Sequence, residues 1–130
     1  MQDKINELKK HVGTPYQMKF EDGNYCGCFY PVYAMWPDAP KYPLPTDDNA
    51  VNYVYGITRI MRECEKIDIK NIQMGDIITC QYNNELHVGV MISKTEVIHV
   101  FKDYKLQIDK LSARFFKDKN LRVFRKKNEA

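Results

Sequence analysis

The residue pattern of this chain changes near Gly75, and the change sets the fold class. Before Gly75, apolar residues recur every three or four positions, which is typical of helices with one buried face. After Gly75, short segments rich in β-branched residues alternate with turns, which is typical of an antiparallel sheet. Helices followed by such a sheet indicate an α+β domain, with the N-terminal helices packed on the antiparallel sheet.

The same patterns predict the individual elements. In the first helix, Ile5, Leu8 and Val12 share one face, and Gly13 ends the helix. Residues 105–108 extend the sheet, and residues 111–116 form a short helix or turn. The expected helices cover residues 3–12, 26–36 and 46–66, and the expected strands cover residues 77–82, 87–92, 97–101 and 121–125.

Composition narrows the class of protein. A chain of 130 residues with 44% hydrophobic residues fits one folded domain, residues 1–130. The net charge is +3, and Lys and Arg alternate with Asp and Glu, so we expect no nucleic-acid partner. No apolar run is long enough to span a membrane, and residues 1–10 lack the pattern of a secretory signal. We therefore expect a protein made in the cytoplasm; the sequence does not define its oligomeric state.

Three residues suit cysteine-nucleophile chemistry: Cys26, His87 and His99. A thiol becomes a nucleophile at neutral pH when an imidazole or a helix N-terminus stabilises its thiolate. Cys26 precedes an apolar segment of helical pattern, and each histidine lies within a segment of strand pattern. The other cysteines of apolar segments, Cys64 and Cys80, are expected to be small core residues.

A zinc site is the competing hypothesis for these residues. Cys26, Cys28, His87 and His99 form a possible Cys₂His₂ set. A C-x-C spacing is less usual than C-x₂₋₄-C for structural zinc, and the histidines are separated in sequence from the cysteines. We therefore favour a nucleophile and expect no metal and no other cofactor.

Five segments, in order, resemble the NlpC-type cysteine peptidases, papain-like enzymes that cut peptidoglycan stem peptides. The family's patterns are an entry Gly-x-Pro-Tyr, a nucleophile motif Asp-Cys-x-Gly-Leu/Phe, a Gly-Asp-Leu turn and two histidine segments, His-Val-Gly-Ile and Phe-Ile-His-Ala. The matching segments here are Gly13-Thr14-Pro15-Tyr16, Tyr25-Cys26-Gly27-Cys28-Phe29, Gly75-Asp76-Ile77, His87-Val88-Gly89-Val90 and Val97-Ile98-His99-Val100.

The resemblance implies a papain-like fold and a catalytic role for three residues. Cys26 is the implied nucleophile, His87 the base that takes the thiol proton, and His99 the group that orients the His87 ring. For the binding of substrate or of the oxyanion, the implied residues are Tyr16, Tyr25 and Gly27.

Two departures from the family pattern concern the substrate. Tyr25 stands where the family has Asp, and Cys28 stands where it has Gly. The family's Asp often holds the amine end of the substrate or the local loop. The replacement of this Asp by Tyr25 leaves the thiol chemistry in place but affects which amide bond is cut.

The implied function is hydrolysis of peptide bonds in peptidoglycan stem peptides, of the γ-D-glutamyl–diamino-acid type, through a thioester on the cysteine. The partner is then the stem peptide. The alternative within the same fold is a non-catalytic protein that binds cell-wall peptide or serves as a phage tail component. A short domain without a secretory signal resembles phage-encoded versions, so we expect association with a phage tail or export by another route.

Strand pairing raises a geometric question about the two histidines. A simple hairpin closed by residues 94–96 pairs His99 with Met91. His87 then shares a face with His99 but lies too far along the strand for a hydrogen bond. On that register, a bulge or a strong bend is needed to bring the two rings together.

Overall fold

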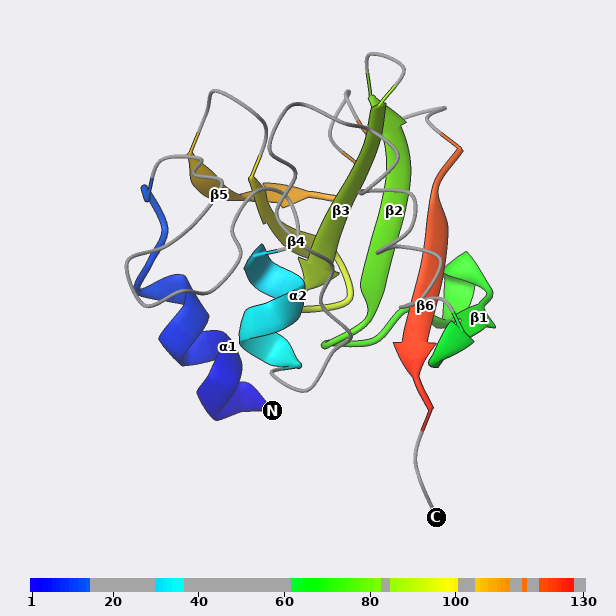
Figure 1. The fold of residues 1–130 in the computed structure, drawn as a ribbon, viewed down its shortest axis with the longest axis horizontal. Helices are drawn as coiled ribbons and strands as arrows, with labels where there is room; N and C mark the ends of the chain where they lie inside the picture. The colour runs from blue at the N-terminus through cyan, green and yellow to red at the C-terminus, as the bar shows by residue number, and fades with distance from the viewer. Residues whose placement is uncertain are drawn as a thin grey trace.

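The computed structural model describes residues 1–14, 30–36, 62–82, 85–100, 105–112, 116 and 120–127. Within these residues, two helices pack beside a six-stranded antiparallel sheet (Figure 1). None of the helices in this described part is long and apolar enough to cross a membrane. The elements are α1 (Gln2–Lys9), α2 (Tyr30–Met35), β1 (Cys64–Ile67), the 3₁₀ helix η2 (Ile69–Asn71), β2 (Ile77–Tyr82), β3 (Glu85–Met91), β4 (Glu96–Val100), β5 (Leu106–Lys110) and β6 (Arg122–Lys126).

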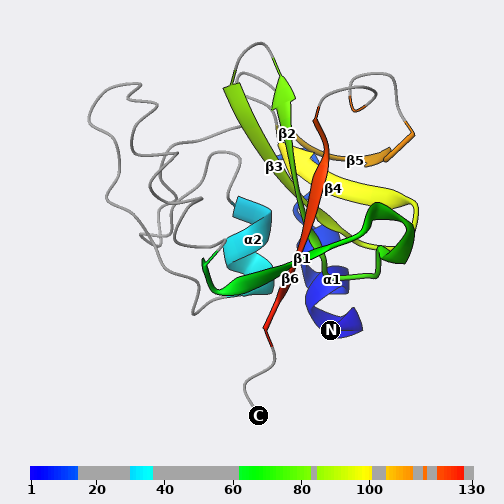
Figure 2. The same ribbon diagram turned by 90° about the vertical axis from the view of Figure 1, so that its right-hand side faces the viewer.

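The sheet has the strand order β1-β6-β2-β3-β4-β5, and all of its neighbouring strands are antiparallel. In Figure 1, β5 runs across the direction of β2, which shows how strongly the sheet twists. In Figure 2 the molecule is seen from the end that carries β1 and β6, and α2 lies to one side of the sheet. Strands β2, β3, β4 and β5 are neighbours both in the chain and in the sheet, so each pairs with the next.

The first helix is confirmed, with one error at its end. Ile5 and Leu8 are buried as expected, but Val12 lies beyond the helix and is 45% exposed. The helix ends at Lys9 and tightens into turns, and Gly13 then redirects the chain with a φ of 98°, a left-handed conformation that glycine adopts without strain. The backbone N–H of Gly13 then donates to the carbonyl of Leu106 at 2.8 Å, which ties the end of α1 to β5.

The two faces of the sheet bury two different clusters. On one face, side chains from α1 and α2 pack on alternate residues of the strands, and α2 contacts β3 and β4. Because side chains alternate along a strand, the intervening residues lie on the opposite face. The helix-side cluster includes Ile5, Leu8, Val32, Trp36, Val88, Val90, Ile98, Val100, Leu106 and Phe124, and the opposite cluster comprises Ile72, Ile78, Cys80, Met91, Val97, Phe116 and Val123.

Strand predictions for the second half of the chain are confirmed, each to within two residues at either end. The helix predicted over residues 46–66 is wrong at its end, because Cys64–Ile67 forms β1. This segment pairs with β6, with Cys64 opposite Lys126 and Ile67 opposite Val123, and that pairing overrides the helical spacing of the sequence. Cys64 and Cys80 are buried, as predicted.

Two expected elements lie wholly or partly outside the described residues. The second helix, predicted over residues 26–36, is described only from residue 30, where α2 begins. Residues 46–61 of the third predicted helix are also outside this part of the chain.

An ion pair between the partly exposed Arg125 and the buried Asp76 connects β6 to the turn before β2. Asp76 is 1% exposed, and its carboxylate accepts from Arg125 Nε at 2.8 Å and from Nη2 at 2.9 Å. The backbone N–H of Gln73 also donates to Asp76, and Arg125 Nη2 reaches the carbonyl of Asn71 at 3.1 Å. Gly75, with φ of 93°, makes the turn that places Asp76 there. The Gly-Asp pair therefore has a structural role, because it fixes the start of β2 against β6.

Replacing Asp76 should destabilise the fold because it leaves the Arg125 guanidinium and the Gln73 N–H without this acceptor. We expect Asp76→Ala to lower the free energy of unfolding by about 1.5–3 kcal/mol, since the Arg125 side chain is partly exposed and water can solvate it. The exposed pair of Lys10 and Glu7 is the matched control, and Glu7→Ala should cost less than about 1 kcal/mol. Urea unfolding of both variants makes the comparison. Equal losses would contradict the assigned role of Asp76.

Candidate functional site

The register of β3 and β4 brings the two histidines together without a bulge. Gly89 pairs with His99, and Met91 pairs with Val97, so the register differs by two residues from the simple hairpin. The turn between β3 and β4 is closed by a hydrogen bond in which the backbone N–H of Ile92 donates to the carbonyl of Glu96 at 2.9 Å. His87 therefore lies diagonally across from His99, a spacing that long side chains bridge. The expectation that a bulge or bend is needed was wrong because it centred the turn on Thr95, whereas the observed pairing is centred on Lys94.

Gly89 leaves room for neighbouring side chains on this face of the sheet. A Cβ atom at Gly89 would lie 2.7 Å from Cγ2 of Val97 and 3.2 Å from Cβ of His99. A contact of 2.7 Å forces atoms to move, so a larger residue at this position would disturb the packing of Val97 beside His99. The glycine of the His87-Val88-Gly89-Val90 segment is therefore explained by packing.

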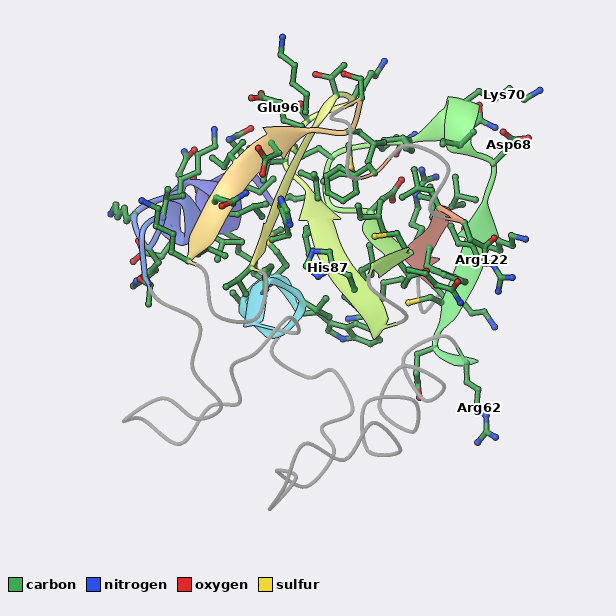
Figure 3. The ribbon with its side chains drawn as sticks, turned by 90° about the horizontal axis from the view of Figure 1, so that it is seen from above. Arg62, Asp68, Lys70, His87, Glu96 and Arg122 are labelled. Atoms are coloured by element: carbon green, nitrogen blue, oxygen red, sulfur yellow. The ribbon has the colours of Figure 1, made fainter. Side chains whose placement is uncertain are left out.

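A buried hydrogen-bonded chain links side chains of three strands. His87 Nε2 lies 2.8 Å from His99 Nδ1, and His99 Nε2 lies 2.7 Å from Asp109 Oδ2. The amide of Gln107 donates to the same Oδ2 at 2.5 Å. His87 lies well inside the molecule in Figure 3, whereas the labelled Arg62 and Lys70 lie at its outside.

The histidines occupy the sheet face opposite α1 and α2. They alternate with Val88 and Ile98 of the helix-side cluster, and the His99 ring contacts Phe116 with ring centroids 5.1 Å apart. His87 is 5% exposed and His99 is 0% exposed. Such burial is costly for a polar ring unless its nitrogens are hydrogen-bonded, which the chain to Asp109 provides.

Burial keeps both rings neutral. Desolvation, with a smaller effect of the neighbouring His99, lowers the pKa of His87 to about 3. Desolvation also lowers the pKa of His99, while the hydrogen bond and the charge of Asp109 act in the opposite direction. A neutral imidazole has one unprotonated nitrogen, so the buried His87 is in the form that accepts a proton.

Of the residues singled out in the sequence, the structure brings His87 and His99 into contact. Cys26, Tyr16, Tyr25 and Gly27 lie outside the described residues. The zinc hypothesis needs Cys26 and Cys28, which are also outside them. Among the residues that are described, no group of three His, Cys, Asp or Glu side chains is placed to hold a metal ion.

Sequence reasoning missed Asp109 and its neighbour Gln107. Leu106 is buried with the helix-side cluster and Ile108 packs against it, so Gln107 and Asp109 face the other way. This polar–apolar alternation was the available signal, and it indicated only which face Asp109 shares. Its contact with His99 depends on the register of β4 and β5, in which Val97 pairs with Asp109 and His99 with Gln107.

Comparison with known proteins adds a family and a fold. The model of the NlpC/P60 family matches residues 13–125 of the chain. A crystal structure from Staphylococcus aureus subsp. aureus Mu50, described as similar to lipoprotein and of the NLP/P60 family, superposes with a TM-score of 0.60 at 18% sequence identity. The similarity covers 93% of this chain and 40% of that one, so this chain spans less than half of its structural neighbour. None of the curated proteins compared with the chain matches it.

The neutral, buried His87 should make the fold sensitive to acid. An imidazole in the unfolded chain binds a proton near pH 6.5, whereas folded His87 does so only near pH 3. The stability is therefore fully present above pH 6.5 and is lost as the pH falls toward 3. Between pH 7.5 and pH 5, His87 should account for a loss of about 2 kcal/mol in the free energy of unfolding.

Urea unfolding across this pH range measures the effect. His87→Gln should flatten the pH dependence, since Gln does not titrate. His11→Gln is the matched control because it removes an exposed imidazole and leaves His87 in place, so the loss assigned to His87 should remain. A His87→Gln profile as steep as that of the wild type would contradict the assignment of a neutral buried ring.

Proposed function

The chain belongs to the NlpC/P60 family, and from this premise we propose that it is a papain-like cysteine peptidase acting on peptidoglycan stem peptides. Members of the family are generally cysteine peptidases, which supports a hydrolase of the cell wall. The bond we propose for cleavage is the γ-D-glutamyl–diamino-acid amide. The proposed nucleophile is Cys26, with His87 as the general base and His99 as the residue that orients it.

The observation that carries the proposal is the buried hydrogen bond of 2.8 Å between His87 Nε2 and His99 Nδ1. It occupies one nitrogen of the His87 ring and fixes the direction of the other, Nδ1. A general base needs a held ring and an unprotonated nitrogen within reach of the proton that it takes. The pairing of two histidines from the motifs that resemble the family matches this requirement.

The proposed reaction has two steps. The Cys26 thiol gives its proton to Nδ1 of His87, and the sulfur attacks the scissile carbonyl carbon to form a tetrahedral oxyanion. The C–N bond then breaks, the amine leaves with the proton from His87, and a thioester remains on Cys26. Water attacks the thioester with His87 again taking a proton, which returns to the thiol as the carboxylic acid is released.

Because the pKa of His87 is low, the ring takes up a proton in this cycle only when a negative charge lies beside it. A ring whose pKa is about 3 does not take a proton from solvent at neutral pH. A thiolate formed beside it supplies a negative charge, and an opposite charge at such short range favours the protonated imidazole. The ion pair of thiolate and imidazolium is thus the state that the proposal assigns to the activated site.

Tyr25 bears on the substrate. A tyrosine in place of the family's aspartate supplies a hydroxyl and an aromatic face where the family has a negative charge. We therefore propose that the chain does not hold a substrate ammonium by a carboxylate at this position. Stem peptides whose amine end is blocked should be cleaved as well as those with an unblocked amine.

Digestion of defined stem peptides tests the function. We expect the wild-type chain to split peptides at the γ-D-glutamyl–diamino-acid bond, with both fragments identified by mass spectrometry. Cys26→Ala should lose this turnover and keep the circular dichroism spectrum of the wild type. Cys64→Ala is the control, since it removes a buried thiol of β1 and should retain turnover.

Two results would count against the proposal. Hydrolysis retained by Cys26→Ala would remove Cys26 as the nucleophile. Binding of the stem peptide without turnover by the wild type, measured by calorimetry, would instead indicate a non-catalytic cell-wall-binding protein of the same fold.

A further inference from the structure

Asp109 ends a side-chain chain that crosses three neighbouring strands. His87 comes from β3, His99 from β4 and Asp109 from β5, and each step runs diagonally between strands on the same sheet face. The two hydrogen bonds, of 2.8 and 2.7 Å, use both nitrogens of the fully buried His99 ring. The protonation of one end of this chain therefore constrains the other.

Two proton arrangements are possible for a pair of neutral, hydrogen-bonded imidazoles. In the first, His87 Nε2 carries the proton and donates it to His99 Nδ1, so His99 carries its own proton on Nε2. In the second, His99 Nδ1 carries the proton and donates to His87 Nε2, so His87 carries its own proton on Nδ1. Each neutral ring has one donor and one acceptor nitrogen, which excludes other combinations.

Asp109 distinguishes the two arrangements. In the first, His99 Nε2–H donates to the carboxylate oxygen, a charge-assisted hydrogen bond whose length of 2.7 Å is usual for that type. In the second, the lone pair of His99 Nε2 would face a carboxylate oxygen at 2.7 Å, with no proton between two acceptors. An ionised carboxylate offers only acceptors, so it excludes the second arrangement.

Gln107 strengthens this selection. Its amide N–H donates to the same Oδ2 of Asp109 that faces His99. The oxygen is therefore approached by nitrogen from two sides, and both contacts need it as an acceptor. Asp109 is also the carboxylate whose charge acts on the His99 ring.

We propose that Asp109 is a positioning residue that sets the tautomers of both histidines and so leaves Nδ1 of His87 as the proton-accepting atom. The inference rests on the proposed function, in which His87 is the base for Cys26. Asp109 acts through His99, because the structure places its carboxylate on the far nitrogen of that ring.

The first arrangement also suits the change of charge during the proposed reaction. When Nδ1 of His87 takes the thiol proton, its Nε2–H bond to His99 stays as it was. No proton needs to move along the chain, and the new positive charge on His87 lies at one end of a chain that has a negative charge at the other. Removing that negative charge should therefore destabilise the thiolate–imidazolium pair.

The tautomers can be read directly by NMR. In protein labelled with ¹⁵N-histidine, long-range ¹H–¹⁵N correlations distinguish protonated from unprotonated ring nitrogens. We expect the wild type to have the proton on Nε2 of both His87 and His99. A proton on Nδ1 of His99 would overturn the inference, and this result needs no variant to fold.

Asp109→Asn tests the cause, because a neutral amide can present either an oxygen or an N–H to His99. Both arrangements then become accessible, so we expect a proton on Nδ1 of His87 in part of the molecules. We also expect the rate of Cys26 alkylation at pH 7 to fall about tenfold, which corresponds to about one pKa unit. Glu96→Gln is the matched control on β4: it also removes one carboxylate charge and should change neither result.

These outcomes separate the inference from the proposed function. Wild-type tautomers and alkylation rates retained in Asp109→Asn would reduce Asp109 to a structural role and overturn the inference. The tautomer readout does not depend on peptide cleavage. A chain that shows the expected tautomer change but cleaves no stem peptide would support the role of Asp109 while contradicting the proposed function.

Discussion

The pairing of Gly89 with His99 is the constraint on which the candidate site depends. On the face that carries the histidines, the side chains of Val97 and His99 leave no room for a Cβ atom at Gly89. This register places His87 diagonally beside His99. A slip of one residue would turn one histidine to the helix-side cluster, because side chains alternate between the faces of a sheet. The register of the strands therefore decides whether the two imidazoles meet.

Burial and hydrogen bonding act together on this pair. The face that carries the histidines also buries an apolar cluster, which includes Met91, Val97 and Phe116. Desolvation there disfavours a charged ring, and the chain to Asp109 satisfies the ring nitrogens that face it. The protein thus keeps two neutral imidazoles at a cost in acid stability. Sites that need such a group commonly reduce the stability of the fold that holds them.

The sequence was informative where a local pattern matched the final structure. The strands after Gly75 follow from β-branched segments and turns, and the burial of Ile5 and Leu8 follows from helical spacing. It failed at Cys64, where pairing with β6 replaces a helical spacing, and at the hairpin of β3 and β4, where the position of the turn along the chain sets the register. Asp109 could not be assigned because its link to His87 depends on two registers at once. Its carboxylate reaches His99 only in this register of β4 and β5, and His99 reaches His87 only in this register of β3 and β4.

The central claim is that His87, held by His99, activates the thiol of Cys26. The most direct test is the rate of iodoacetamide labelling across pH, with each cysteine followed by peptide mass spectrometry. Cys64 is an internal reference, because burial and the charge of Glu63 raise the pKa of its thiol to about 11. The account predicts rapid labelling of Cys26 well below pH 8 that is lost in His87→Ala. Slow labelling of Cys26 with the profile of an ordinary thiol, unchanged in that variant, would contradict it.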